Sequence, residues 1–191
     1  MKQQYNNILR ILGGKYNVYA LVLGLLSLFL LVIFFNPLAR TAKILGVMAA
    51  FTVGNVFLKR WMLPFRSLPL ELELSTFGSV VVTLAFGVKA GILLAVLTCF
   101  AGNHFTRGIS LYTPMMASGY VLAALLAWFM APASIAAGGI VITLIVNAYL
   151  IAIFSMVGYS PLENFLYGAS NVVLNAILFL KVAPWLLQAL T

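Results

Sequence analysis

Long apolar runs separated by short polar breaks form the basic pattern of this 191-residue chain. Within the runs the apolar residues are continuous, whereas strands of a membrane barrel would alternate apolar and polar positions. The pattern therefore predicts membrane-crossing helices, seven in all. We expect them over residues 19–35, 44–58, 71–86, 90–102, 115–130, 135–156 and 165–187.

The breaks predict how the chain is organised. Residues 1–15 form a polar to amphipathic N-terminal segment, and residues 16–36 form an extra transmembrane helix. The run is too long for the apolar region of a signal peptide and lacks a small-residue cleavage site. Residues 44–191 then form a six-helix membrane domain. Within it, residues 87–91 (Gly-Val-Lys-Ala-Gly) predict a tight break between two short helices.

Composition identifies lipid as the solvent of this fold. The chain is 64% hydrophobic and 7% charged, with a mean hydropathy of +1.12, whereas soluble domains carry about 25% charged residues. In lipid every backbone polar group must be paired internally, which again favours helices. The predicted fold class is an all-α integral membrane protein, multi-pass in the plasma membrane.

The charge of the chain limits the classes of binding partner that can be expected. The net charge is +8, with three acidic residues in the whole chain. Basic loops facing anionic membrane lipids explain this excess, and no segment interleaves basic and aromatic residues as a nucleic-acid surface would. A single histidine does not make a zinc site, and the lone Cys99 excludes an intrachain disulfide. We expect no metal and no cofactor.

Ionisable groups near apolar helices are the first candidates for function, because they are costly inside a bilayer. Glu71 and Glu73 open the run 71–86. Either they lie in water at the helix N-terminus, where the dipole favours anions, or one of them lines a polar pocket under the loop 61–70. His104, beside Asn103 and Arg107, is either an ordinary loop histidine or part of such a pocket.

Amides and small residues are the second set of candidates. Asn171 and Asn175 share a helix face, since they are four residues apart; they either bond between helices or reach a ligand. The same alternatives apply to Asn147, and Tyr159 is either an interface anchor or a pocket wall. Small residues on one face of the run 44–58, which would let another helix approach closely, are Ala49, Ala50 and Gly54.

From residue 44 onward, the order of these features resembles the substrate-binding S components of energy-coupling factor (ECF) vitamin transporters. The small-residue face at 49–54, the prolines at 64 and 69 and the stretch Glu-Leu-Glu-Leu-Ser-Thr at 71–76 carry the resemblance. So do the break at 86–91 and the pattern Asn-x-x-x-Asn at 171–175. The break has Val88 where that family usually has proline, and the helix at 16–36 is additional.

The resemblance implies a membrane protein that binds a vitamin-like small molecule. It would dock, through Ala49, Ala50 and Gly54, on a transmembrane T subunit that carries ATPase chains. This chain has no ATP-binding motif, so energy would come from those partners. The ligand-binding residues that we expect are Glu71, Glu73, Asn103, His104, Tyr159, Asn171 and Asn175.

The distribution of basic residues and the resemblance to S components predict opposite orientations of the six-helix domain in the membrane. If residues 16–36 span the membrane, seven basic residues fall on the side of the loops 59–70 and 103–112, against four on or near the other. The positive-inside rule then makes the first side cytoplasmic, whereas the family exposes the loop corresponding to 59–70 outside.

Two other function classes are compatible with the sequence. One is a scaffold or assembly protein resembling the rod-shape membrane protein MreD, in which the polar residues join helices and no pocket is needed. The other is a membrane enzyme that holds a phosphorylated lipid head group. No catalytic motif is present, and the residues that could form its site are Arg66, Glu71, Glu73, His104 and Arg107.

Overall fold

A computed structural model describes residues 40–65, 70, 72–106 and 108–191. The chain divides into two units, Met1–Ala50 and Phe51–Thr191. In the first unit the described residues form the beginning of one helix, and every contact discussed below lies within the second. The predicted N-terminal segments 1–15 and 16–36 lie outside the described residues, as do Arg66, Glu71 and Arg107.

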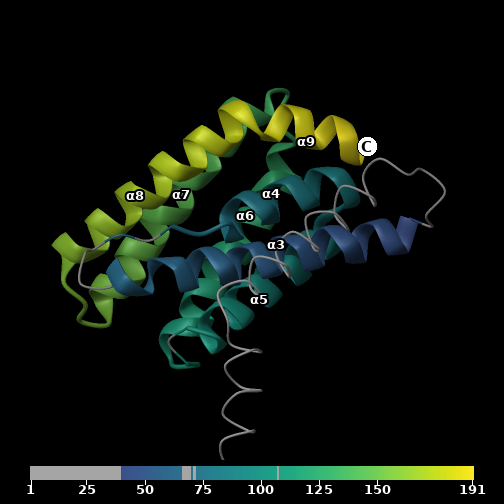
Figure 1. The fold of residues 1–191 in the computed structure, drawn as a ribbon. Helices are drawn as coiled ribbons and strands as arrows, with labels where there is room; N and C mark the ends of the chain where they lie inside the picture. Colours follow the sequence, from purple (N-terminus) through teal and green to yellow (C-terminus); the bar gives the residue numbers. More distant parts are fainter. Residues whose placement is uncertain (1–39, 66–69, 71, 107) are drawn as a thin grey trace, which may run out of the picture. The chain divides into compact units, whose positions relative to one another are not determined.

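The described part of the chain consists of helices joined by short connections and contains no strand (Figure 1). The order of its elements is α3 (Arg40–Met62), the 3-10 turn η1 (Leu63–Phe65), α4 (Ser75–Phe86), α5 (Val88–His104), α6 (Tyr112–Met130), α7 (Ile135–Met156), α8 (Pro161–Lys181) and α9 (Ala183–Leu190).

Three of these helical segments are long and apolar enough to cross a bilayer: Arg40–Phe65, α6 and α7. Helices α8 and α9 would provide a fourth span as a bent pair, with 56° between them. Helices α4 and α5 are apolar but shorter. These helices are those of a membrane-embedded protein, while a total of seven spans stays a prediction.

The predicted helix limits agree best where strong breakers stand in the sequence. The run 135–156 is confirmed residue for residue as α7, which follows Pro132 and a Ser134 cap whose hydroxyl accepts a hydrogen bond from the Ala137 amide. The predicted start of the next helix at residue 44 is too late, because residues 40–43 already belong to α3. The same helix continues through Trp61 and Met62, since no breaker precedes Pro64.

Two more limits differ for local reasons. Asn103 and His104 were expected in a loop but close α5. The predicted run 165–187 begins earlier, at Pro161, because Ser160 caps the helix and proline suits its first turn. It also divides at Val182, since Pro184 lies in the first turn of a separate helix, α9.

A single residue, Gly87, separates α4 from α5. Its φ of +98° is open to glycine and strained for other residues. The Gly87 amide ends α4 by bonding the Thr83 carbonyl, and its carbonyl accepts from the Ala90 and Gly91 amides of α5. The break is therefore tighter than the predicted 87–91.

Close helix contacts depend on glycines. Helices α7 and α8 pack along each other (Figure 1). A Cβ atom at Gly139 of α7 would overlap the Phe179 ring of α8, and one at Gly119 of α6 would lie 2.7 Å from Leu150 of α7. In α4 every residue from Ser75 to Thr83 is buried, so this short helix forms the centre of the described bundle.

Candidate functional site

A buried ion pair lies where the chain enters α4. Glu73 lies two residues before the first residue of the helix, and its Oε2 lies 3.1 Å from the Nζ of Lys59 in α3. The Glu73 side chain is 1% exposed. Removing two charges from water is costly unless they compensate each other. Glu73 therefore lies in the protein interior and not in the head-group water that was one prediction for it.

Two amides of α8 extend this ion pair. Asn171 donates from Nδ2 to Glu73 Oε1 at 3.3 Å. Asn175 in turn donates to Asn171, to its Oδ1 at 2.6 Å and to its carbonyl at 2.9 Å. The predicted common face of Asn171 and Asn175 is confirmed by this bond. Of the two, Asn171 bonds another segment, so its hydrogen bond to Glu73 ties α8 to the segment that leads into α4.

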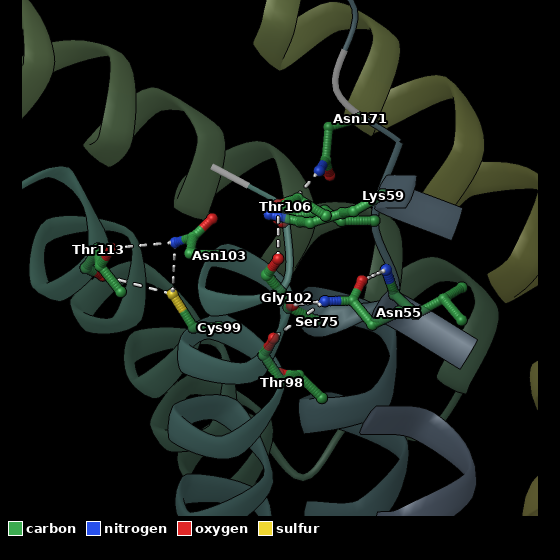
Figure 2. A network of polar contacts seen from close by, with 12 residues as sticks. Asn55, Lys59, Ser75, Thr98, Cys99, Gly102, Asn103, Thr106, Thr113 and Asn171 are labelled. Atoms are coloured by element: carbon green, nitrogen blue, oxygen red, sulfur yellow. Dashed lines mark hydrogen bonds and ion pairs between the residues drawn. The ribbon is translucent and has the colours of Figure 1, made fainter. Parts of the chain in front are cut away.

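Asn55 fixes the same start of α4 from the other side (Figure 2). Its Oδ1 accepts the Leu74 amide at 2.8 Å, and its Nδ2 donates to the Ser75 hydroxyl at 3.2 Å and the Thr98 carbonyl at 3.1 Å. Asn55 is fully buried. One amide therefore connects α3, α4 and α5 and holds the turn that carries Glu73.

Asn103 joins α5 to α6 (Figure 2). Its Nδ2 donates to the Thr113 hydroxyl at 3.3 Å and lies 3.8 Å from Cys99 Sγ. Cys99 itself donates to the Thr113 carbonyl at 3.3 Å. The lone cysteine is buried, in agreement with its interpretation as a small core residue.

Two neighbouring cavities open beside this network. The inner cavity has a volume of about 30 Å³ and the outer one about 300 Å³. The inner cavity has room for about two water molecules. The two share three lining residues, Tyr112, Asn164 and Tyr167. Further polar residues of the inner cavity are Glu73, Asn147 and Asn171, and those of the outer cavity include Asn103, Ser110, Thr113, Tyr159 and Glu163.

Aromatic rings form one side of these cavities. Tyr112 stacks on Phe154, with 4.5 Å between ring centroids and an interplanar angle of 11°. Tyr159 meets both rings edge-on, at 5.9 Å and 5.7 Å. Such edge and stacked contacts are favourable, so each of the three rings supports the orientation of the other two.

The structure brings four of the seven predicted ligand residues to these cavities: Glu73 and Asn171 to the inner, Asn103 and Tyr159 to the outer. Asn175 lines neither cavity and donates a hydrogen bond to Asn171. His104 is exposed at the end of α5, against Phe105, and lines neither cavity. Of the residues predicted for an enzyme site, Glu73 thus lines the inner cavity and His104 lines neither, and the other three are outside the described residues.

Sequence reasoning missed the residues that support Glu73. Asn55 could have been found, because it is a lone amide in an apolar helix, as Asn147 is. Lys59 was counted only as a basic residue of a loop. Nothing in the sequence relates Glu73 to Asn171, which is 98 positions away.

The predicted docking residues Ala49, Ala50 and Gly54 all lie on α3. Within the second unit, Gly54 faces its own chain, since a Cβ atom there would lie 3.3 Å from Leu74 Cδ1. Its lack of a side chain is thus used for packing against the segment that leads into α4. Ala49 and Ala50 belong to the first unit.

No group of three or more His, Cys, Asp or Glu side chains that could hold a metal occurs among the described residues. Comparison with known proteins found no matching protein-family model, curated protein or solved structure.

Proposed function

We propose that this protein is a binding protein of the plasma membrane for a small, vitamin-like solute. The observation that carries the proposal is the pair of cavities with three shared lining residues, one of about 300 Å³ and one of about 30 Å³ beside a buried carboxylate. Ligand pockets are commonly about 300 Å³ or larger, mostly apolar, and carry a few placed polar groups. The outer cavity has the size of a small solute.

The chemistry of the lining supports a solute with both a ring or apolar body and hydrogen-bonding groups. Tyr112, Phe154 and Tyr159 offer aromatic surface, whereas Asn164 and Asn147 offer amide donors and acceptors. In this proposal the solute lies in the outer cavity, with a polar end directed toward the inner one.

The wider proposal is uptake of an ECF type. The binding protein would load the solute and dock on a transmembrane T subunit with ATPase chains, through the face of Ala49 and Ala50 on α3. Gly54 would contribute indirectly, by letting Leu74 pack closely against the same helix.

A thermal-shift screen of the purified full-length protein with a panel of vitamins and phospholipids tests the proposal. We expect at least one vitamin-like solute to raise the melting temperature. The shift should be lost in Asn164→Ala, which removes an amide shared by both cavities. Gln188→Ala is the matched control, because Gln188 is an exposed amide of α9 that lines neither cavity. The proposal fails if no solute shifts the unmodified protein.

A scaffold function is the second candidate, favoured by a different observation. The buried polar groups around Glu73 bond one another, through Lys59, Asn171 and Asn175, as expected where polar residues only join helices. A scaffold would keep its partners when the cavities are altered. Retained co-purification of a cytoskeletal partner by Asn164→Ala, together with an empty solute screen, would identify it.

A further inference from the structure

We propose that the two cavities select a small organic cation over a neutral or anionic solute of the same shape. This inference rests on the proposed solute binding and names its substrate class. Three features of the described residues point to it: the charges on the lining, the direction of the ion pair, and the aromatic wall.

The charged side chains that line the cavities are all acidic. The whole chain has 11 lysines and arginines and three acidic residues. Yet both acidic residues in the described part of the chain, Glu73 and Glu163, line these cavities, and no described lysine or arginine does. This basic protein thus has two of its three acidic side chains on one cavity system, which favours a positive occupant.

The ion pair presents its negative end to the inner cavity. Glu73 is one of the lining residues, whereas Lys59 is not. The lysine stem instead packs against α5, where a Cβ atom at Gly102 would lie 3.1 Å from Lys59 Cδ. An anion entering the cavity would meet the carboxylate first, and an organic cation would meet a favourable charge.

The aromatic wall suits a cation in the outer cavity. Tyr112 and Tyr159 line it, and the edge-on contact at 5.9 Å sets their rings at 61° to each other. An ammonium group within about 6 Å of a ring face gains about 0.5–1 kcal/mol at exposed sites. The two inclined rings and Glu163 line the same cavity, so aromatic and acidic side chains are both available to such a group.

Matched probes of different charge test the inference. The purified full-length protein is titrated with choline, its neutral isostere 3,3-dimethylbutan-1-ol and the anion 3,3-dimethylbutyrate. A second series uses benzylammonium, benzyl alcohol and phenylacetate. Thermal shift and calorimetry give the affinities. We expect the cation of at least one series to bind at least about fivefold more tightly than its neutral and anionic partners.

Variants locate the effect. Tyr159→Leu should weaken binding of the preferred cation about two- to fivefold, the loss expected for one ring, while Tyr159→Phe keeps the ring and should retain it. Glu163→Gln should weaken it by a similar factor. Trp128→Leu is the control. Trp128 is an exposed aromatic residue near the C-terminal end of α6, whereas Tyr112 is the first residue of that helix. Tyr159 and Glu163 are exposed, so these variants should fold.

The outcomes separate this inference from the proposed function. If a neutral or anionic probe binds as tightly as its cation, and Asn164→Ala abolishes that binding, cation selection is wrong while solute binding stands. If only vitamins of neutral or negative charge bind, the result is the same. If neither the probes nor the vitamin panel binds, both proposals fail.

Discussion

At the scale of single residues, the Lys59–Glu73 pair is the contact on which the interior depends. A carboxylate that is 1% exposed is stable in the protein because an ammonium group lies beside it and Asn171 donates to it. The strength of the pair is less important than what happens when one partner is missing, since a single buried charge has no solvent to stabilise it.

We therefore expect Glu73→Gln and Lys59→Met each to destabilise the protein by about 3–5 kcal/mol. The double variant should recover most of this loss, because it leaves no unpaired charge. Unfolding by denaturing detergent, followed by circular dichroism, measures the three free energies. If the losses of the two single variants simply add in the double variant, the pair is not coupled.

Asn55 gives a second prediction at this scale. Asn55→Leu removes the partners of the Leu74 amide and the Ser75 hydroxyl in a buried place, so it should cost about 1–3 kcal/mol. Thr98→Val is the control, because the Thr98 hydroxyl bonds only carbonyls of its own helix, those of Leu94 and Ala95. Equal losses in the two variants would show that Asn55 does not hold the turn.

At the scale of elements, the contact between α7 and α8 tests the role of small residues. Gly139→Ala would place a methyl group in the Phe179 ring. Gly168→Ala instead meets the flexible end of Ile151 at 3.1 Å, and Asn147 at the ordinary contact distances of 3.5 and 3.6 Å. We expect a loss of about 1–3 kcal/mol for Gly139→Ala and a much smaller one for Gly168→Ala. Thermal unfolding of the two variants makes the comparison, and a smaller loss at Gly139 would contradict the packing.

Elements were predicted well where the sequence contains strong local signals. Pro132 and Ser134 fix the start of α7, and Gly87 the break between α4 and α5. The limits of α3 were missed because Arg40, Lys43, Arg60 and Trp61 look like loop residues, although their long side chains are compatible with a helix end. The bend at Val182 was missed because a proline near the end of an apolar run can mark either the end of one helix or the first turn of the next.

The candidate site was predictable only in part, for a physical reason. Polar residues in apolar helices are conspicuous in a sequence, and Glu73, Asn103 and Asn171 were found in this way. Which of them meet is decided by contacts between helices that are far apart in the chain. Lys59 gained its importance from its contact with Glu73, and Asn164 from its place in the lining of both cavities.

At the scale of the whole molecule, the antiparallel course of α6 and α7 gives a test of topology. Leu111 precedes α6 and Met156 ends α7, and each is 86% exposed, while Ser134 lies in the turn between the helices. With Cys99→Ser as background, L111C and M156C should react with an impermeant maleimide from one side of the membrane, and S134C from the other. Reaction of all three from the same side would exclude a spanning hairpin.

The side on which Leu111 reacts tests uptake. Ser110 and Tyr159 line the outer cavity, so uptake requires L111C to react in intact cells from outside. The distribution of basic residues favours the reverse orientation. Protection of L111C from outside, with S134C reactive, would leave solute binding intact and exclude capture from the external medium.

The short helix α5 has a consequence for the surrounding lipid. Its 17 residues reach about 26 Å, which is a few ångströms less than the hydrocarbon thickness of about 30 Å. Unlike the buried α4, it has exposed apolar side chains, among them Leu93 and Leu97. If α5 spans the bilayer, the lipids beside these exposed side chains would have to thin to match its length. Other membrane proteins with short spans would then share the thinned zone and gather beside α5 without any specific contact.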